Sequence, residues 1–153
     1  MADERYKTPS SVFVMLFRNK NGSREILLQK RKNTGYMDGY WDSSAGGHVE
    51  AGESLTSTAV LETKEELSIN VEPQHMKFAM ASYNNFRGTV YCYFYFLIEE
   101  YEGTVSIGNK EKCEEIAWFN VDSMPQGMIP DREESIKNWL DGKIFNEFGW
   151  NRS

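Results

Sequence analysis

The sequence predicts an α/β (α+β) domain with a mixed β-sheet between helices. Segments rich in β-branched and aromatic residues recur along the chain, which is typical of strands. Two other segments carry helix formers and helix-end signals, and strand segments both precede and follow the first of them. With 153 residues, 40% of them hydrophobic, the chain is most simply a single domain over residues 1–153.

The N-terminal part of the chain predicts a β-hairpin followed by a loop. Residues 11–18 read as the first strand and residues 25–30 as the second, because both are rich in aliphatic side chains. An Asn-Gly pair ending at Gly22 lies between them, and this pair tolerates positive φ in tight turns. Residues 31–39 predict a loop, and short strands are expected within the glycine-rich residues 40–48.

The first helix is predicted for residues 55–67. Ser54 precedes it as an N-cap, and its second half is rich in good helix formers. A short strand is expected at residues 69–72.

The C-terminal part predicts further strands and a second helix. Residues 77–83 and 89–99 read as two longer strands, and the second is apolar on both faces, which favours the centre of the sheet. Residues 115–119 predict a short strand. Residues 130–140 predict the second helix, with a proline at its start and a glycine beyond its end.

Charge and composition exclude several classes of partner. The formal net charge is −6, and no basic run extends beyond Lys30-Arg31-Lys32, so a nucleic-acid polymer is not expected as a partner. No apolar run is long enough to cross a bilayer, and the N-terminus has no apolar signal core, so no membrane partner is expected. Cys92 and Cys113 form no metal-binding spacing and are expected as free thiols in a cytoplasmic protein.

Three glutamates share one face of the first predicted helix. Glu62, Glu65 and Glu66 are spaced i, i+3 and i+4, so their carboxylates lie close together. Adjacent carboxylates raise one another's pKa unless a cation offsets their charge. Oxygen ligands favour Mg²⁺ or Mn²⁺. The glutamates alone favour an ordinary solvated helix face, because runs of charge are usually surface.

The whole stretch from residue 47 to residue 69 resembles the Nudix box. Gly47 is followed after five residues by Glu53, and after seven more by LETKEELSI, which matches the family's glycine, its four glutamates and its final aliphatic residue. The resemblance covers nearly the whole chain and implies a Nudix-like α/β/α sandwich with a mixed central sheet.

Three positions depart from the family's pattern. Leu61 replaces an arginine, Thr63 an aliphatic residue and Ser68 a glycine. The family's arginine is expected to pair with the loop glutamate, here Glu53. Leucine cannot do so, and we expect Lys64 or a water to take its place.

The resemblance also implies the residues of the site. Metal ligands are expected at Gly47, Glu62, Glu65 and Glu66, and catalytic roles at Glu66, Glu65 and Glu53. The general base is expected to be a box glutamate, with an acid of the later segment as the alternative: Glu111, Glu114 or Glu115. The expected substrate-binding residues are Arg31, Tyr36, Trp41, Phe86, Trp118 and Asp122.

The implied function is that of a pyrophosphohydrolase dependent on Mg²⁺ (or Mn²⁺), in which water attacks phosphorus. Its partner is a small nucleotide substrate, a nucleoside di- or triphosphate, with oxidised or non-standard dNTPs included. ADP-ribose, nucleotide sugars and pterin triphosphates stay open as substrates. A non-catalytic nucleotide-binding protein is the second class, motivated by Leu61, and prenyl diphosphate isomerisation is a third. The sequence leaves both a monomer and a homodimer open.

Overall fold

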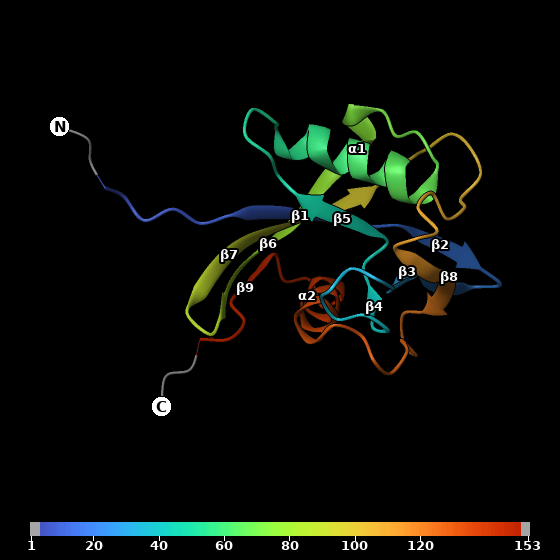
Figure 1. Ribbon diagram of the computed structural model, residues 1–153. Helices are drawn as coiled ribbons and strands as arrows, with labels where there is room; N and C mark the ends of the chain where they lie inside the picture. The colour runs from blue at the N-terminus through green and yellow to red at the C-terminus, as the bar shows by residue number, and fades with distance from the viewer. Residues whose placement is uncertain (1–3, 151–153) are drawn as a thin grey trace.

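The computed structural model describes residues 4–150 and contains two β-sheets (Figure 1). The larger sheet is mixed, because β1 (Ser10–Met15) runs parallel to β7 (Thr89–Ile98), whereas β6 (Met76–Phe86) and β7 are antiparallel. Its strand order is β5-β1-β7-β6-β9, formed by β1 (Ser10–Met15), β5 (Ala45–His48), β6 (Met76–Phe86), β7 (Thr89–Ile98) and β9 (Phe145–Asn146). The predicted central position of the strand at residues 89–99 is confirmed.

The second sheet is antiparallel and lies beside the first. Its central strand β3 pairs with all three of the others. The four strands are β2 (Phe17–Lys20), β3 (Ser23–Arg31), β4 (Trp41–Asp42) and β8 (Cys113–Asn120). The predicted hairpin is therefore present as β2 and β3.

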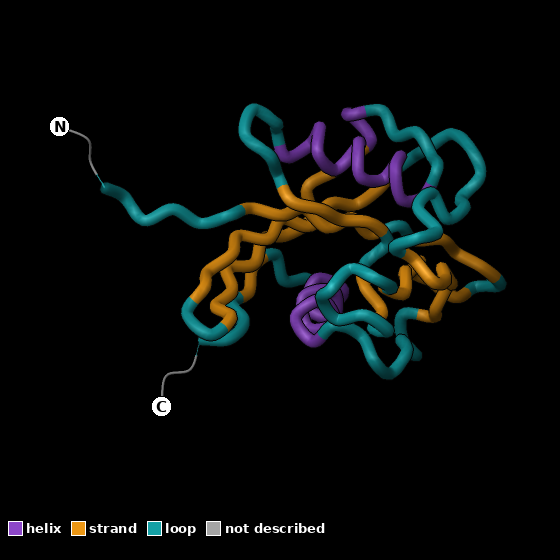
Figure 2. The backbone as a smooth tube through the Cα atoms, viewed as in Figure 1, coloured by secondary structure: helices purple, strands orange, loops and turns teal. Residues whose placement is uncertain are grey.

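The two helices, α1 (Leu55–Leu67) and α2 (Pro130–Leu140), lie on opposite faces of the larger sheet (Figure 2). Successive side chains of a strand point to opposite faces, so one strand can supply two cores. Val12 and Val14 of β1 pack in the cluster that contains Leu67 of α1. Phe13 and Met15 pack in the cluster that contains Ile136 of α2. The predicted α/β/α sandwich is confirmed.

The structure corrects the prediction of one continuous strand at residues 11–18. The chain leaves the larger sheet after Met15 and joins the second sheet at Phe17. The residue between them, Leu16, donates its amide to the Ser44 hydroxyl, and its carbonyl accepts the Leu27 amide, each at 2.9 Å. These bonds turn the chain from one sheet into the other, and no sequence pattern reveals them.

The strand predicted at residues 69–72 is wrong. Only Asn70 pairs there, in an isolated bridge with Glu102. A 3₁₀ helix, η1 (Pro73–His75), follows at once. Proline lacks the N–H that a ladder needs, so its position favours the helical turn. The short strand β9 was not predicted.

Helix α1 has strong signals at both ends. The Ser54 hydroxyl accepts the Ser57 amide at 3.0 Å, which confirms the predicted N-cap. At the C-terminus Ser68 has a φ of 62°, in the left-handed region that favours glycine. Within residues 4–150, neither helix combines the length and apolar character needed to cross a bilayer.

Candidate active site

A cavity of about 620 Å³ lies beside α1 and receives the acidic face of this helix. Glu62, Glu65 and Glu66 all line it, as does Gly47 of β5. A Cβ at Gly47 would lie 2.5 Å from the Glu62 carboxyl carbon. Only glycine therefore allows this carboxylate to lie directly against the strand.

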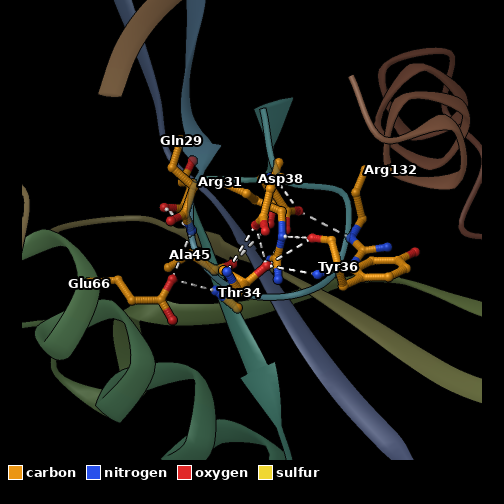
Figure 3. A network of polar contacts seen from close by, with 12 residues as sticks. Gln29, Arg31, Thr34, Tyr36, Asp38, Ala45, Glu66 and Arg132 are labelled. Carbon is orange, nitrogen blue, oxygen red and sulfur yellow. Dashed lines mark hydrogen bonds and ion pairs between the residues drawn. The ribbon is translucent and has the colours of Figure 1, made fainter. Parts of the chain in front are cut away.

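Glu66 is the most deeply held of the three carboxylates. Its Oε1 accepts the Gln29 side-chain amide at 2.7 Å and the Gly46 amide at 3.3 Å (Figure 3). Burial, and the hydrogen bond and like charge of the neighbouring Glu62, raise the pKa of Glu66 to about 9, although the Gln29 bond opposes this. Without a cation, the raised pKa therefore favours the protonated form of Glu66.

The donor set at this end of the cavity fits a hard divalent cation. Within residues 4–150, no three His, Cys, Asp or Glu side chains converge into a preformed metal cluster. The donors are nevertheless all oxygens: the Glu62 and Glu66 carboxyls are neighbours, and Glu65 and Gly47 line the same cavity. A pair of carboxyls that shares a proton can exchange it for a metal ion, since metal ligands bind deprotonated.

A second ionic cluster lies at the other end of the cavity. Arg31 Nη1 is 3.0 Å from one Asp42 oxygen, and Arg132 Nε is 3.1 Å from the other. Arg132 Nη1 is also 2.7 Å from Asp131. Arg132 is only 4% exposed. Burial disfavours its charge, but Asp42 and Asp131 outweigh burial and hold the pKa of Arg132 above its ordinary value. This cluster, formed by Arg31, Asp42, Asp131 and Arg132, neutralises itself.

Aromatic rings surround the Arg132 guanidinium. Its Cζ lies 3.8 Å from the Phe13 ring centroid and 5.1 Å from that of Tyr93. Phe86 and Tyr91 continue this aromatic wall, with ring centroids 5.8 Å apart. Tyr36 lies beside Arg132 in Figure 3 and also lines the cavity. Such a wall suits a flat ligand, because aromatic faces stack on planar rings.

Two loops meet at the cavity. The Lys32 amide donates to the Lys112 carbonyl at 3.1 Å, and the Lys112 ammonium donates to the Asn33 carbonyl. Lys112 and Asn109 line the cavity together with the glutamates. The site thus combines acidic oxygens, a lysine and an aromatic wall, which is a suitable arrangement for an anionic ligand with a flat group.

The structure brings seven of the predicted site residues together. The following all line the cavity: Gly47, Glu62, Glu65, Glu66, Arg31, Tyr36 and Phe86. Arg31 is held in place from two sides, because its Nε donates to the Tyr36 carbonyl at 2.8 Å while Nη1 pairs with Asp42.

Glu53 lies outside the cavity lining and has partners other than those expected. Its Oε1 accepts the Glu50 amide at 3.0 Å and the Thr58 hydroxyl at 3.2 Å. Lys64 instead donates to the Asn70 side chain, so the expected pairing of Lys64 with Glu53 is wrong. Leu61 is 42% exposed on α1. Glu53 is therefore satisfied without an arginine at position 61.

Three predicted substrate-binding residues do not line the cavity. Trp41 is buried against Phe119, with the ring centroids 4.9 Å apart. Trp118 packs under Arg18, whose Cζ lies 4.3 Å from its ring centroid. Asp122 is exposed in the turn after β8.

The alternative acids also lie outside the cavity lining. Glu114 is 3.5 Å from the Lys30 ammonium, which turns it toward β3. The Glu111 carbonyl accepts the Asn33 side chain at 3.3 Å, and Glu115 is an exposed residue of β8.

Sequence reasoning missed most of the cavity lining, including the charged and amide side chains of Gln29, Asp42, Asn109, Lys112 and Arg132 and the aromatic rings of Phe13, Tyr91 and Tyr93. One signal was available, because Gln29 and Arg31 are two apart on one strand and so share a face. The others had none. Asp42 and Arg132 are 90 positions apart, and only the folded chain joins them.

Helix α1 carries the glutamates, follows the glycine strand β5 and lines the cavity. The larger sheet has one helix on each face, and this combination is that of a Nudix-type domain. Residues 7–140 match the family model described as "NUDIX domain". The chain belongs to the Nudix family.

Two curated relatives match part of the chain. A stretch of 67 residues, 43% of this chain, is 39% identical to an uncharacterised Nudix hydrolase of Pseudomonas aeruginosa and covers 38% of it. A stretch of 76 residues, 50% of this chain, is 33% identical to dihydroneopterin triphosphate diphosphatase of Escherichia coli K12 and covers 47% of it. The matched part spans less than half the length of either relative.

Solved structures share the fold. A MutT NUDIX hydrolase from Burkholderia pseudomallei superposes with a TM-score of 0.73 at 22% identity, covering 86% of this chain and 98% of that one. The NUDIX domain of Shewanella oneidensis NrtR, solved with ADP ribose, superposes with a TM-score of 0.71 at 17% identity and covers 90% of each chain. At these identities the likeness concerns the fold alone.

Proposed function

We propose that this protein is a divalent-metal-dependent pyrophosphohydrolase that cleaves a nucleoside di- or triphosphate. One observation carries the proposal: the half-buried Glu66 lies against Glu62, and within residues 4–150 no ion pair joins either carboxyl, or Glu65, to a lysine or arginine. Such a pair is stable only when it is protonated or bound to a cation.

The three cavity glutamates share one role in this proposal, and Glu66 has a second. Glu62, Glu65, Glu66 and the Gly47 carbonyl would hold Mg²⁺ or Mn²⁺. A bound ion supplies positive charge to a diphosphate and lowers the pKa of a water molecule. Gln29 and Gly46 fix one oxygen of Glu66, which leaves the other oxygen to accept a proton from the attacking water.

The remaining residues bind and orient the substrate. Lys112 offers an ammonium to phosphate on the glutamate side of the cavity. The aromatic wall of Phe86, Tyr91 and Tyr93 would stack on the flat group at the other side. Glu53 acts at a distance, since its bonds to Glu50 and Thr58 brace the loop that precedes α1.

Substrate identity is proposed by class. One relative is a dihydroneopterin triphosphate diphosphatase, and one fold neighbour was solved with ADP ribose. Both ligands combine a flat heterocycle with linked phosphates, which matches the two ends of the cavity. A (deoxy)nucleoside triphosphate, oxidised forms included, is the leading class. The non-catalytic alternative is weakened because Glu53 has partners despite Leu61.

A substrate panel tests this proposal. The protein is incubated with standard and oxidised dNTPs, ADP-ribose, nucleotide sugars and a pterin triphosphate, each with Mg²⁺, Mn²⁺ or EDTA. Release of phosphate or pyrophosphate that needs the metal supports the enzyme, and Glu72→Gln, an exposed residue outside the cavity, serves as the control variant. Binding without turnover for every substrate would instead support a nucleotide-binding protein.

A further inference from the structure

The segment that connects β7 to β8 is bound to the C-terminal end of α1. The last carbonyls of a helix have no partner within it. Here the Gly108 amide donates to the Glu66 carbonyl at 2.9 Å, and the Ser106 amide donates to the Leu67 carbonyl at 3.0 Å. A distant segment of the chain therefore fixes the turn of α1 that carries two of the three cavity glutamates.

Gly108 allows this contact because it has no side chain. A Cβ at this position would lie 1.9 Å from the Glu65 carbonyl oxygen and 2.8 Å from the Glu65 carbonyl carbon. Because Cβ atoms essentially never approach another atom closer than 3.0 Å, the two backbones would have to separate by about 1.1 Å (3.0 minus 1.9). No flexible side chain is available to move instead, since the obstacle is main chain.

The backbone of Gly108 imposes no requirement of its own. Its φ lies outside the left-handed region, so alanine can adopt the same conformation. Gly22, in the turn between β2 and β3, is the opposite case, with a φ of 80° and open space around it. Alanine at Gly108 thus disturbs only the contact with α1, whereas alanine at Gly22 disturbs only local backbone.

The contact between Gly108 and α1 also affects the cavity through the residues that follow Gly108. The residue after Gly108 is Asn109, and Lys112 follows shortly, and both line the cavity with Glu65 and Glu66. The same close approach therefore affects where the segment with Asn109 and Lys112 lies relative to Glu65 and Glu66. A displacement of about 1 Å in such a site costs roughly 100-fold in rate, because reacting groups leave their productive geometry.

We propose that Gly108 is a positioning residue for Glu65 and Glu66: it seats the β7–β8 segment on the last turn of α1 and so fixes these carboxylates for metal binding. The proposal rests on the proposed function of the glutamates. Gly108 is not a lining residue of the cavity, and it acts through the main chain of α1.

The test compares Gly108→Ala with Gly22→Ala and the wild type. Mn²⁺ binding is measured from the loss of the free-ion EPR signal, and folding from circular dichroism and the melting temperature. We expect Gly108→Ala to bind Mn²⁺ at least about tenfold more weakly and to lose more in kcat than in KM. Gly22→Ala is expected to melt at a lower temperature but to bind Mn²⁺ like the wild type.

The outcomes separate this proposal from the proposed function. Mn²⁺ binding by the wild type with equal affinity in Gly108→Ala would overturn the positioning role alone. No Mn²⁺ binding by the wild type would overturn both. Weakened binding in both variants would show that lost stability, not the contact at α1, governs the affinity, and would also overturn the positioning role.

A measurement on the wild type covers the case in which Gly108→Ala does not fold. Mg²⁺ is titrated while the amide resonances of Gly108 and Glu66 are followed by NMR. We expect both amides to shift with one midpoint, since a hydrogen bond joins Gly108 to the Glu66 carbonyl. A response at Glu66 with none at Gly108 would overturn the proposal.

Discussion

The two ends of the cavity place charge in opposite ways. At the α1 end, Glu62, Glu65 and Glu66 have one sign of charge and no lysine or arginine ion pair within the described chain. At the α2 end, Asp42, Asp131 and Arg132 are more deeply buried, yet together with Arg31 their charges are balanced pair by pair. At the α2 end the charges are balanced in the folded chain itself, whereas the carboxylates at the first, α1 end are balanced only by a proton or a cation. This difference supports our proposal that the chemistry takes place at the first end.

The largest expected effect concerns the balanced end. Arg132→Ala leaves Asp42 and Asp131 without their shared partner, and removing one member of a buried ion pair typically costs about 3–5 kcal/mol. We expect a loss of this size in the free energy of unfolding, measured by urea denaturation. Lys137→Ala on the same helix breaks only the exposed pair with Glu133 and should cost less than about 1 kcal/mol. Equal losses of stability in the two variants would contradict the claim that the buried cluster of Arg31, Asp42, Asp131 and Arg132 stabilises the fold more than an exposed ion pair does.

Glu66→Gln is the matching change at the incomplete end. Loss of a positioned acid/base or metal ligand should reduce turnover by at least about two orders of magnitude. The free energy of unfolding of the metal-free protein should change much less than turnover, because glutamine resembles the protonated form of the Glu66 carboxyl. Nearly normal turnover in the substrate panel would contradict the role given to Glu66.

The same variant has an expected signature in the pH dependence of stability. The pKa of Glu66 is raised in the folded protein, so between its ordinary value of 4.5 and about 9 the folded state binds more protons than the unfolded state. Stability of the metal-free protein should therefore fall as pH rises through this window. Melting temperatures in EDTA at pH 5 and pH 8 should show a decrease that is smaller in Glu66→Gln, and Glu72→Gln should behave like the wild type.

A smaller effect is expected where α1 ends. Ser68 has a φ of 62°, and Ser68→Gly should stabilise the protein by about 1 kcal/mol by removing the left-handed strain. The same exchange inside the helix, Ser57→Gly, should instead destabilise it by about 1 kcal/mol through lost capping and chain entropy. Thermal denaturation distinguishes the two signs, and a loss in both variants would show that Ser68 is not strained.

The smallest effect is expected at Leu61. Leu61→Arg restores the family's arginine on an exposed position, where an ion pair with Glu53 is worth at most about 1 kcal/mol. Because Glu53 already accepts two hydrogen bonds, we expect a change in turnover of less than about threefold relative to the uncharged Leu61→Gln. A much larger gain would show that Glu53 needs a charged partner.

Local patterns predicted the α1 end well and the α2 end poorly. The spacing of Glu62, Glu65 and Glu66 fixes their common face, because a helix repeats within the segment itself. Arg132 and Asp42 meet only through packing of α2 against the rest of the fold. The sequence around either residue does not indicate that it pairs with the other. Tryptophans were overvalued as ligand contacts for the same reason, since only packing decides that Trp41 and Trp118 point away from the cavity.

The break at Leu16 gives one continuous segment membership of both sheets. The two sheets can separate only if this segment loses its strand pairing in one of them. The cavity is lined by residues of both sheets. Because the connection between the sheets is covalent, we expect cooperative unfolding: the cavity and the fold of the domain should be lost in one transition, not in succession.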